Sequence, residues 1–206
     1  METSYKISLS PQTIDSAPEE VQPILEATKK QLGFLPNMYG NLANSLGLLS
    51  TYKLGYDLFR KKSGFSRVQQ EVIFLTISYE NECRYCVAAH SFMADMMAKV
   101  PVEVTEAIRN GTIIQDPKLR ALSEFTSIMV NKRGNPEVED VEGFLAAGYT
   151  EAQILEIILA ISIKTISNYT NHVFDTPVDL VMKSREWAGY SIARKIVRFF
   201  GGDRRG

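Results

Sequence analysis

The hydrophobic positions of the chain recur mainly at helical spacing. Apolar residues three and four positions apart form the series Leu42, Leu46, Leu49 and the series Leu119, Leu122, Phe125, Met129. Glycines follow many of these segments, as expected where helices end. No alternating polar and apolar run of useful strand length stands out. Because an ordinary domain is only about one third helix, this pattern predicts an all-α fold.

The predicted helices cover most of the chain. Their approximate ranges are 18–32, 41–62, 66–80, 82–99, 101–110, 116–131, 137–147, 150–174 and 177–200. A chain of 206 residues, of which 45% are hydrophobic, is long enough to bury a sizeable core. We therefore expect one folded domain over residues 1–206.

Two segments of the chain resemble each other at a spacing of 84 residues. The segment GFSRVQQEVIFLTIS begins at Gly64, and the segment GYTEAQILEIILAIS begins at Gly148. Each carries Ser or Thr followed three positions later by Gln, which predicts a capping box at the start of each helix. We expect an internal duplication, with a first repeat over about 41–110 and a degenerate second repeat over about 116–190. The alternative is a chance likeness of two amphipathic helices.

The charge of the chain gives no reason to expect nucleic acid or an anionic membrane as its main partner. The formal net charge is -1, and basic residues gather only near the end, where we interpret the tail 201–206 as a solvated extension. The first residues lack the apolar segment of a signal peptide. The longest apolar run, Ile154 to Ile163, is shorter than the ~20 residues of a membrane span. These features predict a cytoplasmic protein.

The stretch ECRYCVAAH holds both cysteines and one of the two histidines of the chain. Thiols are kept reduced in the cytoplasm, so cysteines three positions apart are more often catalytic, redox-sensing or metal-binding there than structural. Asn81 is a suitable N-cap, which would place Cys83 in the first turn of a helix, where the helix dipole favours a thiolate. Cys86 and His90 would follow on the same face, and His90 could take or relay a thiol proton.

Glu71 is a further candidate for the same site. It precedes Cys83 by twelve residues, which on one unbroken helix is about 18 Å. A turn near Asn81 would fold the two helices together and bring the carboxylate back. Because its neighbours in QQEVIFLTI are mostly apolar, Glu71 either lies at the polar edge of its helix or is a buried acid with a functional role.

The pattern of Glu71, Cys83-x-x-Cys86 and His90 resembles the AhpD-like alkylhydroperoxidase branch of the carboxymuconolactone decarboxylase superfamily. The segments LGFLPNMYGNLA, CRYCVAAHS and ISNYTNHVFDTPVD are similar to its peroxidase-related members, and the resemblance covers about residues 20–190. It implies an all-helical fold assembled as a homo-oligomer, either a trimer or a hexamer. It also implies a peroxidase that reduces a small hydroperoxide without a cofactor and is regenerated by a dithiol, thioredoxin-like or lipoyl electron donor.

The same resemblance implies a role for each residue of the pattern. Cys83 and Cys86 would be the redox pair, and Glu71 and His90 the proton relay. The family pattern implies that Cys86 attacks the peroxide and Cys83 resolves the product, whereas the dipole argument makes Cys83 the more acidic thiol. This chain also departs from AhpD, which has a histidine just before the second cysteine where this chain has Tyr85. One proton-handling group is therefore absent.

Tyr85 and His172 are candidates for the wall of a substrate pocket. Tyr85 coincides with Tyr169 at the repeat spacing. The alternative, which we favour, is that both tyrosines pack in the core of their own half. For His172 the alternative is a histidine on the side of a helix with a single hydrogen bond.

Other functions remain open at this point. The cysteines could be a buried, inert pair, or they could bind zinc together with His90 and a fourth ligand from His172 or Glu71. No second C-x-x-C motif exists to close an ordinary zinc site. A non-enzymatic redox sensor would change its oligomeric state when the disulfide forms. A lyase of the decarboxylase type, acting on a small lactone, would have no use for a cysteine pair.

Overall fold

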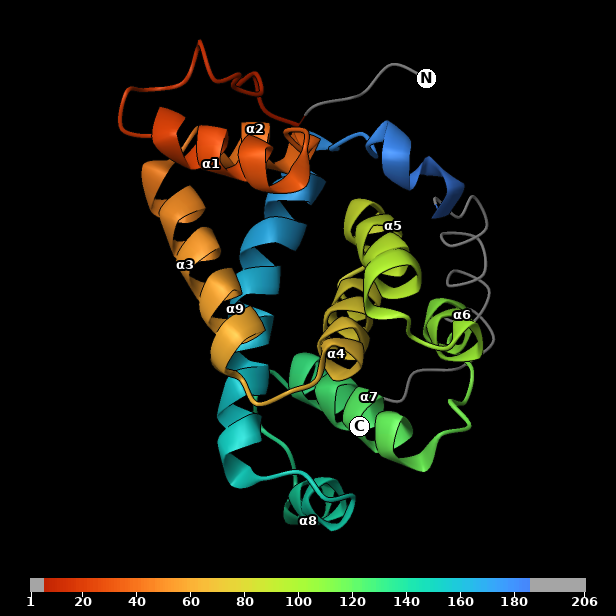
Figure 1. Ribbon diagram of the computed structural model, residues 1–206. Helices are drawn as coiled ribbons and strands as arrows, with labels where there is room; N and C mark the ends of the chain where they lie inside the picture. Colours follow the sequence, from red (N-terminus) through yellow and green to blue (C-terminus); the bar gives the residue numbers. More distant parts are fainter. Residues whose placement is uncertain (1–5, 186–206) are drawn as a thin grey trace.

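The computed structural model describes residues 6–185, and every regular element in that range is helical (Figure 1). The α-helices are α1 (Gln22–Leu32), α2 (Asn37–Leu42), α3 (Leu46–Lys62), α4 (Arg67–Glu80), α5 (Arg84–Met93), α6 (Val102–Asn110), α7 (Pro117–Asn131), α8 (Val138–Ala146) and α9 (Glu151–Phe174). A π-helical turn, η1 (Ala94–Ala98), follows α5, and a 3-10 helix, η2 (Leu180–Arg185), ends the described part. The predicted all-α fold is confirmed.

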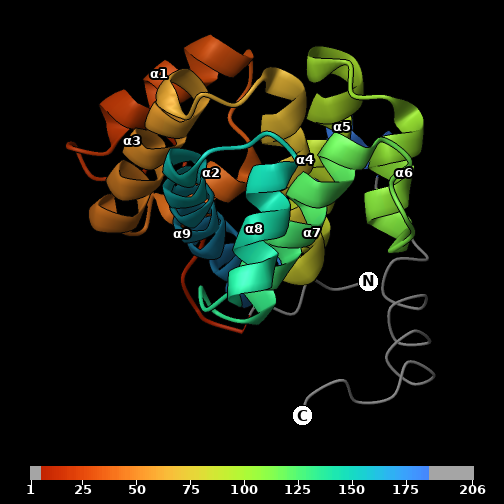
Figure 2. The same ribbon diagram turned by 90° about the horizontal axis from the view of Figure 1, so that it is seen from below.

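Helix α4 forms the centre of the fold. It packs against α5, α6, α7 and α9, while α3 packs along α9. Figure 1 shows α3 and α9 side by side, with α1 and α2 across one end of the molecule and α8 at the other end. Figure 2, which views the molecule from below, shows α7 next to α8 on the side that faces the viewer. Large buried apolar side chains from several helices fill the space between these layers, among them Phe59, Phe74, Leu122, Phe144 and Ile157.

The two helices that look alike in the sequence begin in the same way. Ser66 and Thr150 each accept a hydrogen bond from the backbone N–H of the Gln three residues later, and each Gln side chain bonds back to the backbone. Shortly before each helix a glycine has a positive φ, 71° at Gly64 and 84° at Gly148, a conformation that suits glycine. Both predicted capping boxes are confirmed, while the internal duplication stays a prediction.

The two aligned tyrosines lie in different environments. Tyr85 is 4% exposed, whereas Tyr169 is 58% exposed on α9. The expectation that each packs in a core is therefore wrong for Tyr169. The reason is that α9 runs straight through the position at which the first segment breaks between α4 and α5, so the two side chains reach different surroundings.

Two predicted helices differ from the structure. The range 41–62 is broken before α3, because Ser45 has an extended backbone and its side chain accepts a hydrogen bond from the backbone N–H of Leu48. The range 177–200 does not begin as a helix, since residues 177–179 precede η2. The rest of that predicted helix, together with the basic tail, lies outside the described residues.

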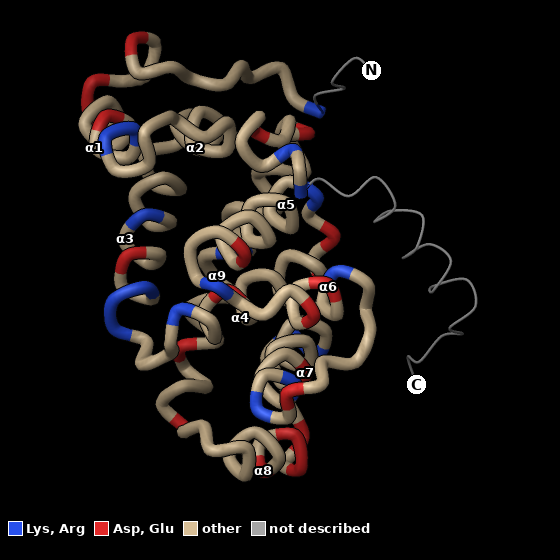
Figure 3. The backbone as a smooth tube through the Cα atoms, turned by 45° about the vertical axis from the view of Figure 1, so that its right-hand side comes forward, with Lys and Arg blue, Asp and Glu red and all other residues tan. Residues whose placement is uncertain are grey.

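Charged residues of both signs are interspersed along most of the helices (Figure 3). Three cationic side chains are nevertheless largely buried, those of Arg60, Arg109 and Lys164. Within residues 6–185, no single helix combines the length and apolar composition that a membrane crossing requires. By those two criteria only α8 and α9 taken together qualify, and they are bent by 110° relative to each other.

Candidate active site

Both cysteines lie at the bend between α4 and α5. Asn81 ends α4, Glu82 turns the chain with a φ of 57°, and Cys83 is the N-cap of α5. Cys86 follows in the first turn. Both thiols are free, and both residues are 1% exposed. The predicted break is confirmed, but the expectation that Asn81 caps the helix is wrong, because the left-handed backbone of Glu82 delays the start of α5.

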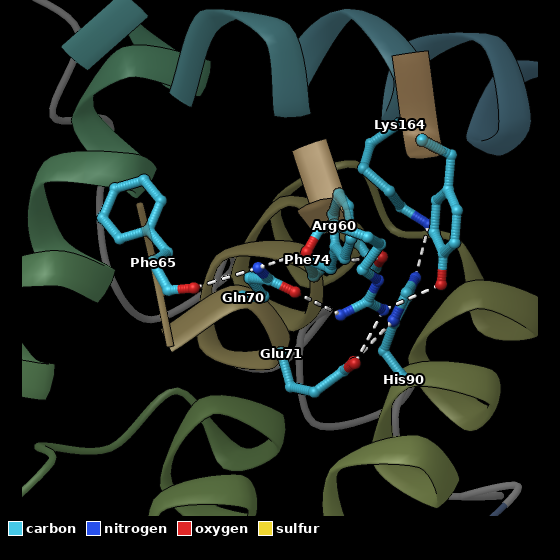
Figure 4. Close-up of polar contacts among 9 residues, drawn as sticks. Arg60, Phe65, Gln70, Glu71, Phe74, His90 and Lys164 are labelled. Carbon is cyan, nitrogen blue, oxygen red and sulfur yellow. Dashed lines mark hydrogen bonds and ion pairs between the residues drawn. The ribbon is translucent and has the colours of Figure 1, made fainter. Parts of the chain in front are cut away.

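Glu71 and His90 meet across the contact between α4 and α5 (Figure 4). The Oε2 atom of Glu71 lies 2.9 Å from Nδ1 of His90, and both side chains are buried. The bend at residues 81–83 brings the two helices together and returns the carboxylate to the cysteine-bearing helix. Of the two interpretations that the sequence left open, Glu71 is the buried acid and not the polar edge of its helix.

Arg60, on α3, pairs with the other carboxylate oxygen of Glu71. Its Nη2 atom lies 2.7 Å from Glu71 Oε1, and its guanidinium carbon lies 4.8 Å and 4.7 Å from the ring centres of Tyr56 and Phe74. Burial acts to raise the pKa of Glu71. The hydrogen bond from His90 and the charge of Arg60 outweigh burial and hold that pKa below its usual value. Glu71 is therefore an anion held between two partners.

Lys164, on α9, lies on the other side of the His90 ring. Its Nζ atom is 2.9 Å from Nε2 of His90, and the residue is 1% exposed (Figure 4). Burial and the charge of Lys164 lower the pKa of His90 to about 4, although Glu71 acts in the opposite direction. The imidazole is therefore neutral at neutral pH. Its Nδ1–H donates to Glu71, and its Nε2 accepts from the ammonium group of Lys164.

Asn171, about two turns further along α9 than Lys164, contacts both sulfur atoms. Its Nδ2 atom donates to Cys86 Sγ at 3.2 Å and lies 3.9 Å from Cys83 Sγ. Burial acts to raise the pKa of Cys86, but the thiol of Cys83 and the charge of Lys164 outweigh it. His90 and Asn171 act in the same direction, so the pKa of Cys86 lies well below its usual value.

Cys83 is the less acidic thiol of the pair. Burial raises its pKa, and the hydrogen bond that its thiol makes to Cys86 raises it further. The dipole argument made from the sequence is therefore wrong. It placed Cys83 in the first helical turn, whereas that place belongs to Cys86, and the negative charge of one sulfur disfavours ionisation of the other.

A small cavity of about 90 Å³ lies beside these groups. Cys86, His90 and Lys164 line it together with the polar side chains of Thr28, Gln31 and Lys53. The rest of its wall is aromatic and apolar, including Tyr39, Tyr52, Tyr56, Tyr85, Met38, Met93 and Met182. An opening of this size and composition would hold a small molecule with an apolar portion next to the sulfur of Cys86.

The two pocket candidates from the sequence lie in different places. Tyr85 lines the cavity, and its hydroxyl donates a hydrogen bond to the carboxylate of Asp179. Burial and the charge of Asp179 raise the pKa of Tyr85, so its hydroxyl keeps its proton. His172 is half-buried on α9 and does not line this cavity; its ring stacks on Tyr169 with 6.4 Å between the ring centres.

Metal binding has little support in the described part of the chain. Among residues 6–185, no group of three or more His, Cys, Asp and Glu side chains is arranged to hold a metal ion. Both ring nitrogens of His90, which the zinc interpretation requires as a ligand, are already hydrogen-bonded.

The sequence interpretation did not assign Arg60, Lys164 or Asn171 to the site. A signal for the residues on α9 exists in hindsight: Lys164, Asn168 and Asn171 are polar positions four and three residues apart on one face of a mostly apolar segment. Arg60 gives no such signal, because it stands in the basic helix end LFRKK, where a solvated charge is the ordinary expectation.

Comparison with known proteins supports the resemblance read from the sequence. Residues 50–127 match the model of the carboxymuconolactone decarboxylase family. No curated protein matches the chain. Among solved structures, the alkylhydroperoxidase AhpD core of an uncharacterized peroxidase-related protein from Ralstonia eutropha JMP134 superposes with a TM-score of 0.75 and 20% identity, over 84% of this chain and 93% of the other.

Two further structures are similar over nearly their whole length. An uncharacterized peroxidase-related protein from Silicibacter sp. TM1040 has a TM-score of 0.72 and 20% identity, covering 87% of this chain and 94% of the other. The debrominase Bmp8, solved in complex with 2,3,4-tribromopyrrole, has a TM-score of 0.71 and 18% identity, covering 87% and 95%. This chain therefore has the AhpD-like fold, and its segment 50–127 is similar to the carboxymuconolactone decarboxylase family.

Proposed function

We propose that this protein is a thiol-dependent peroxidase that reduces small hydroperoxides with the Cys83–Cys86 pair. The observation that carries the proposal is the environment of Cys86. Cys86 lines the cavity, and its sulfur accepts a hydrogen bond from Asn171. The neighbouring thiol and the ammonium group of Lys164 lower the pKa of this thiol. A thiolate, and not a thiol, is the nucleophile in such reactions.

The reaction balances with these two sulfurs and an external dithiol. The Cys86 thiolate attacks one peroxide oxygen, so that an S–O bond forms and the O–O bond breaks. The sulfur is oxidised to a sulfenic acid, and the other oxygen leaves with a proton as an alcohol. Cys83 then displaces the sulfenic oxygen, which leaves as water, and a disulfide forms. A dithiol donor reopens the disulfide by thiol exchange and is itself oxidised.

Glu71 and His90 form the proton-handling arm of the site in this proposal. Glu71 fixes the ring of His90 through Nδ1, which leaves Nε2 facing Lys164 and the cavity. Tyr85 stands where AhpD has a histidine, and its hydroxyl is committed to Asp179. The proton that the leaving oxygen needs must therefore come from another group than the side chain at position 85.

The substrate and partners follow from the size and chemistry of the site. A cavity of about 90 Å³ with an apolar wall favours a hydroperoxide with a short organic chain. Because the sulfurs are buried, they favour a slender reductant, such as a lipoyl arm or another small dithiol, over a protein that would have to dock with its bulky surface. No resident cofactor takes part in these steps. Assembly as a trimer or hexamer, which the family resemblance implies, is part of the proposal, and so is the cytoplasmic location predicted from the sequence.

Removal of bromine from an aromatic ring is a second candidate reaction. The fold is similar to that of the debrominase Bmp8, and four tyrosine rings line the cavity beside Cys86, those of Tyr39, Tyr52, Tyr56 and Tyr85. Such rings could stack on a planar substrate. Bromide release from a bromopyrrole would favour this reaction over peroxide reduction.

The test is peroxide consumption by the reduced protein with dihydrolipoamide as donor. Wild type is compared with Cys86→Ser, Cys83→Ser and the remote surface variant Lys132→Met. We expect many turnovers in wild type and Lys132→Met, and none in Cys86→Ser. A single equivalent that forms the disulfide and then stops, with a change in oligomer size, would indicate a redox sensor. Peroxide that leaves both thiols free would overturn the proposal.

A further inference from the structure

Lys164 is a charged group of the site for which the cysteine, histidine and glutamate motif provides no role and which, unlike Arg60 and Lys53, has no carboxylate partner among residues 6–185. It lies on α9, in the second half of the chain, and is 1% exposed. A lysine ammonium loses much hydration when it is buried, so such a position requires compensating partners. Within residues 6–185 the hydrogen bond of Lys164 goes to Nε2 of His90, and the ring of Phe74 lies 5.8 Å from its Nζ atom.

The neutral imidazole compensates a buried cation only in part. Arg60 and Glu71 behind it form an ion pair, so their charges largely cancel. The group as a whole, including Lys164, carries one excess positive charge next to the cavity. An anion on the cavity side would balance that charge, and Cys86 lines the same cavity as Lys164.

The number of hydrogen-bond donors on the ammonium group also indicates that Lys164 acts toward the cavity. An ammonium has three N–H donors, and His90 takes one of them. Among the described residues no acceptor takes the other two, so they can bond to acceptors at the cavity, such as the thiolate and the oxygen atoms of a substrate. His90 itself has no free donor or acceptor, because Nδ1 is bonded to Glu71 and Nε2 to Lys164.

We propose that Lys164 is a catalytic residue of this site: it is the counter-ion of the Cys86 thiolate, and it donates the proton to the oxygen that leaves when the peroxide bond breaks. This inference rests on the proposed peroxidase function. Glu71 and His90 then act as positioning residues, which hold the ammonium group against the cavity. Substrate protonation thus comes from α9 and not from the cysteine-bearing helix.

The proton balance of this step closes over one catalytic cycle. As the S–O bond forms and the O–O bond breaks, the leaving oxygen takes a proton from Lys164 and departs as an alcohol, which leaves a neutral amine. The thiol proton of Cys83 leaves with the sulfenic oxygen as water. The external dithiol then supplies two protons as it reduces the disulfide, one to Cys83 and one to the amine of Lys164.

The experiment separates the charge of Lys164 from its proton. Lys164→Met removes both, and Lys164→Arg keeps the charge but does not release a proton near neutral pH. Each is made in full-length wild type, for turnover, and in a Cys83→Ser background, where iodoacetamide reports Cys86 alone. Lys132→Met is the matched surface control. The charged and titratable groups that surround Cys86 and Lys164 are Cys83, His90, Glu71, Arg60, the Lys53–Asp57 pair, Asp179 and the cavity tyrosines.

We expect the two variants to differ in a way that a merely structural lysine would not produce. In Lys164→Met, alkylation of Cys86 at pH 7 falls about tenfold or more and its pH profile moves to higher pH, because the thiolate loses its counter-ion. Peroxide turnover falls by at least about 100-fold, the scale of a lost acid catalyst. In Lys164→Arg, alkylation stays within about threefold of wild type, while turnover still falls by about ten- to 100-fold.

Three outcomes would contradict the inference. If Lys164→Met keeps the alkylation profile and the turnover of wild type, Lys164 is neither counter-ion nor acid. If Lys164→Arg restores full turnover, the residue supplies charge but no proton. If wild type itself does not turn over peroxide, the proposed function and the acid role fail together, while the alkylation profiles still decide the counter-ion role. Circular dichroism and thermal unfolding show whether each variant is folded.

Discussion

The strongest quantitative consequence of the site concerns His90 and pH. Its folded-state pKa is about 4 against an ordinary value of 6.5. At pH 5 the unfolded chain therefore carries a proton on this histidine that the folded chain does not. Because the unfolded state binds more protons, stability falls as pH falls between these two values. Each tenfold difference in proton affinity is worth about 1.4 kcal/mol, so the full contribution is about 3 kcal/mol, and about 2 kcal/mol of it is lost between pH 7 and pH 5.

The perturbation that isolates this contribution is His90→Gln, since a glutamine amide can still donate to Glu71 but has no proton to gain in this range. Urea unfolding is measured at pH 7 and at pH 5 for both proteins. Wild type should lose about 2 kcal/mol more than His90→Gln over this interval. His172→Gln, which removes the other histidine from a half-buried position on α9, is the control and should behave as wild type.

Equal losses in wild type and His90→Gln would refute the reasoning. Such a result would mean that His90 gains its proton in the folded protein as easily as in the unfolded chain. The buried contact between the Lys164 ammonium and Nε2 of His90 could then not exist at pH 5, because a protonated ring has no acceptor for it. The inference about Lys164 would lose its geometric basis as well.

Three further variants test the packing around the site by urea unfolding at pH 7. Glu71→Gln leaves the buried Arg60 without its anion and should cost about 3–5 kcal/mol; a loss below about 1 kcal/mol would show that the pair contributes little. Tyr85→Phe removes a hydrogen bond to the Asp179 carboxylate and should cost about 1.5–3 kcal/mol, and an unchanged stability would mean that this bond is replaced by water. Thr150→Ala removes the cap of α9 and should cost about 1 kcal/mol, with no change in Cys86 alkylation.

The parts of the fold that could be predicted from the sequence are those with local causes. The capping boxes at Ser66 and Thr150 depend on residues three positions apart, and both are present. The bend near Asn81 was also visible, because a short polar segment separates two apolar ones. The exact cap of α5 was not, since it depends on the left-handed backbone of Glu82, a residue type without a strong preference for that conformation.

Only the residues of the sequence motif could be predicted as members of the candidate site. Cys86, His90 and Glu71 lie on two consecutive helices, so one bend suffices to bring them together. Arg60 lies on α3 and Lys164 on α9, and their positions depend on the packing of α9 against α4 and of α3 against α9. No spacing along the chain encodes that packing. The relative acidity of the two thiols depends on the same packing, which is why the dipole argument chose the wrong cysteine.

The tyrosine at position 85 and the buried Lys164 are related, because Lys164 can provide the proton that a tyrosine at position 85 does not. With tyrosine before the second cysteine, the motif residues of the first half offer the cavity no free proton donor: Tyr85 keeps its proton for Asp179, and His90 is neutral with both nitrogens bonded. Lys53, which also lines the cavity from α3, is ion-paired with Asp57. The reaction nevertheless needs a cation to hold the thiolate and a proton for the leaving oxygen. Lys164 offers both from the second half, so the two halves of the chain would share the chemistry: one contributes the sulfurs, and the other contributes the charge that makes one of them reactive.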